Sequence, residues 1–288
     1  MVAALLLLRA TTAAAAPSSF CDDDGWAEVW ADHFNGKELN TTSWTVDLNA
    51  GDSRVRDSQG TADNVYLEDG DLVLRSQEQS AGKWNYTSGA VQTMGKQSWK
   101  GLTRACVRAR LPGGEGGEGP RKDSAGIWPA HWMMPDNKAC WPSNGEIDIM
   151  EMVNGDGVTH ATYHWRERET GGCGDTCGNG SKVPACRHPS IGATHKDGTD
   201  ASDYHEYAVE YSKDHIHFAL DGEVFQQLTP DSKTTHGRMP AEFFDVPYYM
   251  ILNTAVGGPW PGEPTLKTKF PTYHRIDYVK IAQPKSEA

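Results

Sequence analysis

Short alternations of apolar and polar residues recur along the chain and are separated by turn-forming residues. From His215 to Leu220 every second residue is apolar, which places those side chains on one face of a β-strand. Asp221-Gly222 follows directly and leads into a second apolar run, so this segment predicts a β-hairpin. Comparable strand patterns occupy Leu72–Leu74 after the turn Glu68–Asp71, Tyr248–Asn253 and Arg275–Ile281.

Helical periodicity is missing from the sequence. No segment of about 12 residues carries an apolar stripe at helical spacing, and neither an internal repeat nor an interdomain linker is visible. Thirty Gly and sixteen Pro divide the 288 residues into short elements, while ten Trp, ten Tyr and seven Phe supply apolar bulk for a large core. The pattern therefore predicts an all-β fold, organised as a single domain over residues 17–288.

The first 16 residues differ in composition from the rest of the chain. Leucines fill positions 5–8, and alanines fill positions 13–16 ahead of Pro17. A short apolar run followed by small residues is typical of a secretory signal peptide, although Arg9 follows the leucines instead of preceding them. We therefore expect residues 1–16 to be a signal peptide and the protein to be secreted; a disordered Ala-rich tail is the alternative. No other segment approaches the roughly 20 apolar residues that a membrane span requires.

Charge narrows the range of partners. The chain carries 27 Lys and Arg against 39 Asp and Glu, a net charge of −12. Such an acidic surface repels phosphate groups, so we expect neither nucleic acid nor a membrane as a partner. Two long loops, Pro112–Ala125 with five glycines and Arg166–Tyr204 without apolar periodicity, are expected at the rim of a binding site. Plain surface insertions are the alternative for both loops.

Six cysteines form an even set, at positions 21, 106, 140, 173, 177 and 186. An even number in an exported chain indicates disulfides, whose pairing the spacing does not decide. A zinc site at Cys173, Cys177 and Cys186 is the alternative, but the chain has no Cys-x-x-Cys pair. Glycosylation acceptor tripeptides, which agree with export, begin at Asn40, Asn85 and Asn179.

Carboxyl groups are concentrated in the segment Asn144–Met152. Residues two apart in a strand share a face, so Glu146 and Asp148 point together, away from the neighbouring isoleucines. Strict alternation would turn Glu151 inward, where burying a lone carboxylate is costly. We therefore expect a β-bulge at Ile149-Met150, which returns Glu151 to the acidic face.

Three carboxyls in one row cannot all ionise freely, so at least one pKa must rise. Glycoside cleavage requires two carboxyls in different protonation states, one to attack the anomeric carbon and one to protonate the leaving oxygen. The row of Glu146, Asp148 and Glu151 therefore predicts a glycosidase. Ordinary surface acids on a solvated strand edge are the alternative.

The run Glu146-Ile147-Asp148-Ile149-Met150-Glu151 resembles the Glu-x-Asp-x-x-Glu signature of glycoside hydrolase family 16, in the bulged form of its laminarinase-like β-1,3-glucanases. The resemblance implies a concanavalin A-like β-jelly-roll sandwich with a concave cleft, and cleavage of internal β-1,3 or mixed β-1,3/1,4-glucosidic bonds with retention. It assigns Glu146 as the nucleophile, Glu151 as the acid/base and Asp148 as the group that tunes the nucleophile. Further matching segments are Gly126–Pro135, Trp141–Gly145, Tyr204–Tyr211, Leu252–Gly262 and Ile276–Ile281.

Substrate-binding residues are expected around this row. Sugar rings stack their CH-rich faces on flat aromatic side chains, and their hydroxyls seek polar groups. Four tryptophans near the signature or after the Gly257-Gly258 turn suit the first role, with core packing as the alternative. The resemblance supplies three polar residues for the second, each with a purely structural role as the alternative. The expected set is Asn64, Arg108, Trp128, Trp132, Trp141, His164 and Trp260.

Two details of the family pattern differ in this chain. Cys106, which shares strand parity with Arg108, replaces an acidic residue, and a disulfide narrowing one end of the cleft is expected there. Relatives often hold a structural calcium on the convex side, and Gly70 and Asp277 match its ligand positions. His33 stands where the family usually has Glu, which weakens the anionic ligation that calcium prefers.

No cofactor is required for the expected reaction, and no His-Glu-x-x-His motif indicates a catalytic metal. The expected partner is a β-glucan polysaccharide, and the expected state is a monomer. One alternative function is a non-catalytic β-glucan recognition protein, although such proteins typically lack one or both glutamates. Another is a family member that acts on a different polysaccharide or works as a transglycosylase.

Overall fold

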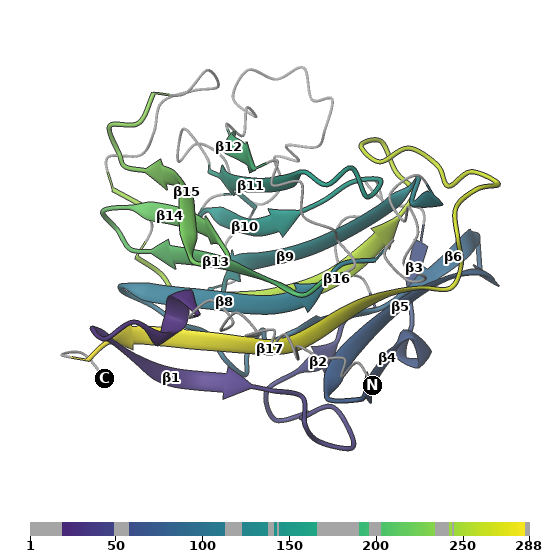
Figure 1. Cartoon of the computed structure of the whole chain (residues 1–288), viewed down its shortest axis with the longest axis horizontal. Helices are drawn as coiled ribbons and strands as arrows, with labels where there is room; N and C mark the ends of the chain where they lie inside the picture. The colour runs from purple at the N-terminus through teal and green to yellow at the C-terminus, as the bar shows by residue number, and fades with distance from the viewer. Residues whose placement is uncertain are drawn as a thin grey trace, which may run out of the picture.

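The computed structural model describes residues 19–48, 58–112, 123–137, 141–142, 144–165, 190–195, 203–233, 242–243 and 245–285. Strands dominate this part of the chain, accompanied by the short 3-10 helices η1 (Phe20–Asp22) and η2 (Ala62–Asn64) (Figure 1). Among these residues no helix has the length and apolar character needed to cross a membrane. The predicted signal peptide, residues 1–16, lies outside the described residues.

The strands form two sheets. The ten-stranded sheet contains β1 (Trp26–Asp32), β3 (Ser58–Gly60), β4 (Val65–Glu68), β5 (Asp71–Ala81), β6 (Trp84–Ser88), β8 (Thr103–Arg110), β13 (His205–Tyr211), β14 (Ile216–Leu220), β15 (Glu223–Leu228) and β17 (Thr272–Pro284). The seven-stranded sheet contains β2 (Thr45–Val46), β7 (Ala90–Gln92), β9 (Ile127–Pro135), β10 (Glu146–Glu151), β11 (Thr159–His164), β12 (Ser190–His195) and β16 (Tyr248–Val256).

Strand order shows how the chain moves between the sheets. The ten-stranded sheet runs β15-β14-β13-β8-β17-β5-β6-β3, with β1 beside β17 and β4 beside β5. The seven-stranded sheet runs β12-β11-β10-β9-β16-β7-β2. Pairing is antiparallel except between β3 and β6. The all-β prediction is confirmed, and the predicted hairpin is β14–β15, whose first strand begins at Ile216, one residue after the predicted start at His215.

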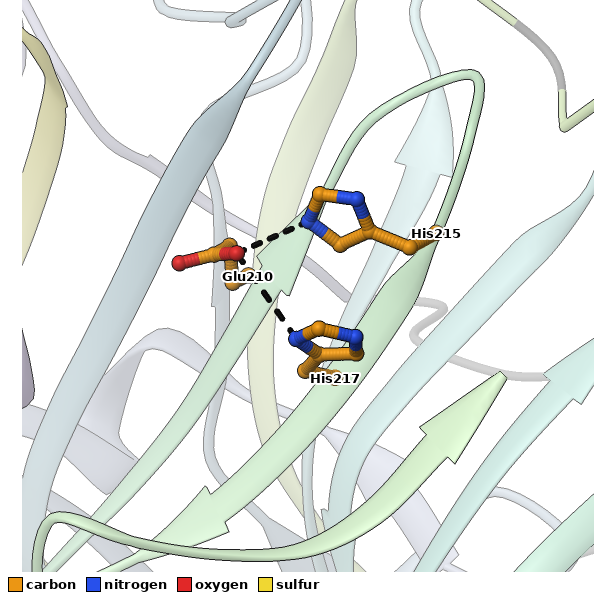
Figure 2. A group of neighbouring side chains, drawn as sticks. All are labelled: Glu210, His215 and His217. Atoms are coloured by element: carbon orange, nitrogen blue, oxygen red, sulfur yellow. Dashed lines mark hydrogen bonds and ion pairs between the residues drawn. The ribbon is translucent and has the colours of Figure 1, made fainter. Parts of the chain in front are cut away.

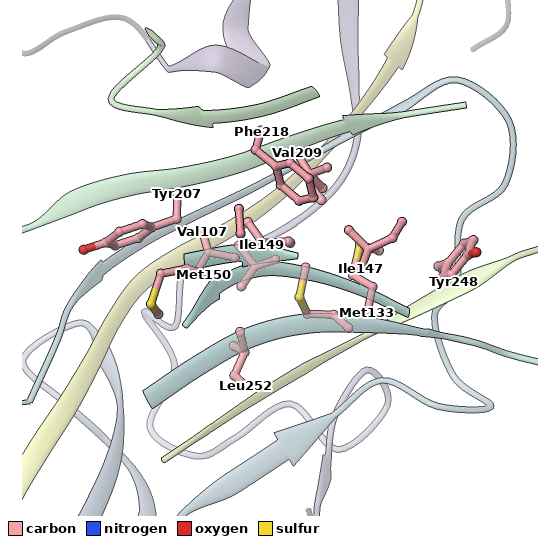
Figure 3. Packing of buried hydrophobic residues seen from close by; sticks show 14 of the residues in the cluster. Val107, Met133, Ile147, Ile149, Met150, Tyr207, Val209, Phe218, Tyr248 and Leu252 are labelled. Carbon is pink, nitrogen blue, oxygen red and sulfur yellow. The ribbon is translucent and has the colours of Figure 1, made fainter. Parts of the chain in front are cut away.

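The hydrophobic core lies between the two sheets. Alternation sends Val107 of β8 and Val209 of β13 inward from one sheet, and Ile147 of β10 and Leu252 of β16 inward from the other (Figure 3). All four are almost fully buried. Burying each such side chain stabilises the fold by about 1.5–3 kcal/mol. Because alternation along β8, β10 and β13 directs one set of side chains into this core, the residues of opposite parity on these strands lie on the outer faces of the sandwich.

A disulfide joins Cys21 to Cys106 on the outer face of the ten-stranded sheet, where both pack against Ala208 and Ala282. A disulfide at Cys106 was expected from the sequence, but its place is different. The carboxylate row belongs to β10 of the other sheet, so this disulfide does not narrow a cleft around that row. The four remaining cysteines lie outside the described residues.

One predicted loop contains a strand. The stretch Arg166–Tyr204 shows no apolar periodicity, yet β12 lies within it and pairs with β11 along its whole length. The prediction of a structureless loop there is wrong because β12, at the edge of the sheet as described, can be held by its backbone pairing with β11, which requires no apolar alternation. Most of the other predicted loop, Pro112–Ala125, lies outside the described residues.

Candidate active site

The three carboxylates of β10 lie on the outer face of the seven-stranded sheet. Asp148 pairs with Trp132 of β9, whereas Met150 pairs with His131, the next residue along, so β10 carries one extra residue here. The register against β11 shifts over the same interval, between Asp148 and Glu151. The bulge predicted at Ile149-Met150 is therefore confirmed, and both of these residues are buried in the core.

The backbone turn directly before Glu146 requires a glycine at position 145. Gly145 has a φ of +85°, which L side chains rarely adopt. A Cβ atom at this position would lie 2.7 Å from the hydroxyl of Tyr248 and 2.8 Å from the hydroxyl of Tyr163. Tyr248 also donates a hydrogen bond of 2.6 Å to the carbonyl of Asn144. This tight turn fixes where β10 begins and therefore where Glu146 points.

Each outer carboxylate accepts a hydrogen bond from a tryptophan. Nε1 of Trp141 donates to Oε2 of Glu146 over 2.5 Å, and Nε1 of Trp128 donates to Oε1 of Glu151 over 3.0 Å. Asp148, which is 3% exposed, lies between them in the strand. Nε2 of His164 is 3.2 Å from Oδ2 of Asp148 and 4.0 Å from Oε1 of Glu146. The row is thus held in a defined geometry from β9, β11 and the turn before β10.

The pKa values of all three carboxyls are raised. Burial first, and then repulsion from Asp148, raise the pKa of Glu146 to about 8, against the lowering influence of His164 and Trp141. Burial also raises the pKa of Asp148 to about 8, although its hydrogen bond with Glu146 lowers it. Burial and the charge of Asp148 hold the pKa of Glu151 well above its ordinary value. The row therefore retains protons at neutral pH, which acid catalysis needs.

Aromatic side chains extend the site along the outer face of the sheet. The rings of Trp128 and Trp260 meet edge to face with centroids 5.1 Å apart, and His160 of β11 meets Trp260 at the same distance. Trp260 is 45% exposed and Trp141 is 36% exposed, so both present a ring to solvent. Apolar ring surface beside a carboxylate row suits a ligand with both CH faces and hydroxyls.

Two residues of this region were not predicted from the sequence. Asn253 of β16 accepts a hydrogen bond of 2.7 Å from Nε1 of Trp132, which fixes the orientation of that ring. His160 lies directly opposite Glu151 in the ladder between β10 and β11. Parity along β11 was a usable signal, since His160 and His164 are four residues apart and therefore share a face. The predicted residues Trp128, Trp132, Trp141, His164 and Trp260 are all brought to this face.

Arg108 is not brought to the site. It lies on β8, in the ten-stranded sheet, with its side chain on the face opposite to the core residue Val107. There its guanidinium donates to Oδ2 of Asp277 and stacks over the ring of Tyr204 at 4.8 Å. The prediction that Arg108 contacts substrate beside the carboxylates is therefore wrong. The prediction that Arg108 points away from the core is correct, but Arg108 lies in a different sheet from the carboxylate row.

Asn64 and the expected calcium ligands have other partners. Asn64 is fully buried in η2, where Oδ1 accepts hydrogen bonds from Arg75 over 3.0 Å and from Gln77 over 3.1 Å. These contacts are to β5 and not to the carboxylate row. The carboxylate of Asp277 is paired with the guanidinium of Arg108. A carboxylate already neutralised by a cation does not fit the anionic ligation that calcium prefers, so the Asp277 carboxylate does not fit the expected calcium site.

A two-sheet sandwich that carries a bulged carboxylate row flanked by tryptophans defines a polysaccharide-cleaving class of enzyme. The model of glycosyl hydrolases family 16 matches residues 56–280, and the chain belongs to this family. It is 31% identical over 270 residues to the beta-glucanase of Rhodothermus marinus, covering 89% of this chain and 85% of that protein.

Two further similarities agree with the family assignment. The chain is 31% identical to glucan endo-1,3-beta-glucosidase A1 of Niallia circulans over 88% of its own length, and it spans 37% of that longer protein. The laminarinase catalytic domain of Thermotoga maritima MSB8 superimposes with a TM-score of 0.72 at 29% identity, covering 90% of this chain and 99% of that one. The predicted jelly-roll sandwich is confirmed by this likeness.

Proposed function

We propose that this chain is an endo-acting hydrolase of β-1,3-glucan that also accepts mixed β-1,3/1,4-glucan and retains the anomeric configuration. The main support for the proposal is the β-bulge in β10, which returns Glu151 to the row that holds Glu146 and Asp148. Two catalytic carboxyls on one row can approach the same glycosidic bond, which double displacement requires. Two similar proteins are named beta-glucanase and glucan endo-1,3-beta-glucosidase A1, which supports a glucan as the substrate.

In this mechanism Glu146 attacks the anomeric carbon as its carboxylate. The N–H of Trp141 and the nearby His164 stabilise that anionic form, since both lower the pKa of Glu146. Attack expels the leaving sugar, whose glycosidic oxygen takes the proton of Glu151. Burial and the neighbouring negative charges keep that proton on Glu151 at neutral pH. Glu151, now ionised, then activates the water that hydrolyses the glycosyl ester on Glu146.

Asp148 has a supporting role in the proposal. It lies between the two glutamates and shares a hydrogen bond with Glu146, through which the proton of Glu146 can pass to Asp148 before Glu146 attacks. The exposed rings of Trp141 and Trp260 would stack on successive sugar rings. Trp128 holds Glu151 through its N–H group and packs against Trp260, so it links sugar binding to the position of the acid.

We further propose that the protein is exported and acts as a monomer on extracellular polysaccharide. The apolar segment before Pro17 is one support. The Cys21–Cys106 disulfide is the other, because disulfides persist in oxidising compartments. Expression of the full chain, followed by N-terminal sequencing of protein from the medium, tests export. A product that stays in the cell with Met1 intact contradicts it.

Reducing-sugar release from laminarin, lichenan and agarose, measured side by side, tests the proposed activity. Release from laminarin, with slower release from lichenan, is the expected result, and Glu146→Gln should abolish both. Release from agarose alone would assign the site to another polysaccharide. Retention on laminarin without any release would identify a glucan-recognition protein instead.

A further inference from the structure

A second cluster of ligating side chains lies on the outer face of the ten-stranded sheet, on the opposite side of the sandwich from β10. It consists of Glu210 of β13, His215 in the turn before β14, and His217 of β14 (Figure 2). Each offers one ligand atom, and these three atoms lie within 4.8 Å of one another. Figure 2 shows both imidazole rings directed at one oxygen of Glu210. The proposed glycosidase chemistry makes no use of this cluster.

The hairpin explains why the three residues converge. Glu210 and His217 are directly opposite each other in the ladder between β13 and β14. His215 precedes His217 by two positions and therefore shares its face. The two rings stack, with centroids 4.4 Å apart and an interplanar angle of 29°. Ser212, in the turn, lies 3.2 Å from Nδ1 of His215, which leaves Nε2 directed at Glu210.

A second set of contacts fixes the carboxylate itself. Nε of Arg104 donates to Oε2 of Glu210 over 2.7 Å, and the same guanidinium donates to the carbonyl of Phe20 and to Asp23. Oε1 of Glu210 therefore faces the histidines, at 2.8 Å from Nε2 of His215 and 3.7 Å from Nδ1 of His217. Outer partners that orient a ligand in this way are typical of protein metal sites.

Hydrogen bonding explains only part of this geometry, and the distances are compatible with a bound metal ion. Ligands placed 2.0–2.1 Å from a tetrahedral zinc ion are separated from one another by about 3.3 Å. The two observed separations, 2.8 and 3.7 Å, lie on either side of that value. A hydrogen bond accounts for His215, but 3.7 Å is too long to account for His217. The histidine side chains are 24% and 25% exposed, so an ion can enter and water can complete its coordination.

We propose that Glu210, His215 and His217 bind one divalent transition-metal ion of the zinc class. Two imidazole nitrogens and one carboxylate oxygen select such ions over calcium and magnesium, which prefer all-oxygen sites. The carboxylate supplies one negative charge, and the Asp23 carboxylate offsets the positive charge of Arg104 behind it. The ion would clamp the β13–β14 hairpin on the face away from the carboxylate row.

Isothermal titration of the full, metal-stripped chain with ZnCl₂ tests the proposal, with His217→Gln as the variant and His33→Gln as the matched control. His33 is an exposed histidine outside the cluster. We expect zinc affinity to fall at least tenfold in His217→Gln, or one equivalent of zinc to be lost, while the control behaves as the wild type. Zinc bound elsewhere on the chain is common to all three proteins and cancels in the comparison. Identical isotherms for the wild type and His217→Gln would overturn the proposal.

Two further measurements keep the result interpretable. Zinc should raise the melting temperature of the wild type more than that of His217→Gln, and millimolar CaCl₂ should reproduce neither effect. An equal rise in both proteins, or an equal rise with calcium, counts against the site. Should His217→Gln fail to fold, His215→Gln replaces it. Because β13 and β14 lie in the other sheet from β10, laminarin hydrolysis should be the same in the wild type and the folded variant. Failure of the proposed glucanase activity would leave the zinc comparison intact.

Discussion

A buried pair of histidines that links the two sheets should contribute a loss of stability when the pH falls. Nε2 of His131, on β9, lies 2.9 Å from Nε2 of His274, on β17, and their rings stack with centroids 5.0 Å apart. Both residues are fully buried. The hydroxyl of Thr254 lies 3.2 Å from Nδ1 of His274. Protonating either ring would place a charge in the core, so the folded state keeps both neutral.

The pKa values give the size and sign of the effect. Burial lowers the pKa of His274 to about 3, and burial together with His274 lowers the pKa of His131 well below its ordinary value. A histidine whose folded pKa is depressed contributes stability that is present above about pH 6.5 and is lost as the pH falls toward the folded pKa. At about 1.4 kcal/mol per pH unit, His274 alone removes about 2 kcal/mol of unfolding free energy between pH 6.5 and pH 5. His131 adds a loss of the same sign.

The active-site carboxyls act in the opposite direction. Because the pKa values of Glu146 and Asp148 are raised to about 8, their stabilisation is present below their unfolded values and is lost as the pH rises through 8. Between pH 7.5 and pH 5 the wild type therefore gains stability at β10 while it loses stability at the histidine pair. A difference between variants isolates the histidine contribution, whereas the wild-type curve alone does not.

The assay is urea unfolding followed by tryptophan fluorescence at pH 7.5 and pH 5.0, with the disulfide oxidised. The double variant His131→Leu/His274→Leu removes both partners together, which leaves no half-satisfied ring in the core. We compare the change in unfolding free energy from pH 7.5 to pH 5.0 in the two proteins. This change should be more favourable in the double variant than in the wild type, by at least about 2 kcal/mol. His33→Leu, at an exposed position, should keep the wild-type pH dependence. Equal pH dependence in the wild type and the double variant would refute the reasoning, and His131→Gln serves if the double variant does not fold.

Four shorter predictions concern catalysis and the disulfide. Glu146→Gln should lower kcat on laminarin by about 1,000-fold or more while glucan binding is retained, since an amide cannot form the glycosyl ester; comparable turnover would contradict the nucleophile assignment. Glu151→Gln should lower kcat by about 10²–10⁴-fold, and azide should restore cleavage of aryl glycosides, because azide needs no general base. The first product seen by proton NMR should be the β-anomer, and early α-anomer would indicate inversion. Cys106→Ser opens a disulfide between residues separated by 85 positions. That loss should cost about 4 kcal/mol in urea unfolding, and an unchanged midpoint would contradict it.

Local patterns predicted those parts of the fold that depend on local physics. The turn at Asp221-Gly222 and the alternation before it predicted the β14–β15 hairpin. The cost of burying Glu151 predicted the bulge in β10, because no other arrangement keeps a carboxylate out of the core. Both predictions rest on the period of a strand and on the desolvation of a charge, which act over a few residues and are visible in the sequence.

Long-range pairing accounts for the errors. Parity correctly placed Arg108 on an outer face, but nothing local distinguishes the outer face of one sheet from that of the other. That choice depends on β8 pairing with β13 and β17, which lie far along the chain. The histidine pair was missed for the same reason. His131 is next to Trp132 on β9, so its side chain points to the opposite face, into the core. Its partner His274, however, is 143 positions away along the chain and lies in the other sheet.

The pairing of β1 with β17 has a consequence for how this domain can be rearranged and joined to others. Trp26 lies opposite Pro284, and the N–H of Lys285 donates to the carbonyl of Gly25 over 3.1 Å. The two ends of the sandwich are thus adjacent and could be joined by a short peptide, so circular permutation with new ends at Asp221-Gly222 should preserve the sheets. Both ends also emerge from the sheet that lacks the carboxylate row, so a module fused at either end would leave the face that holds Glu146 open to long polysaccharide chains.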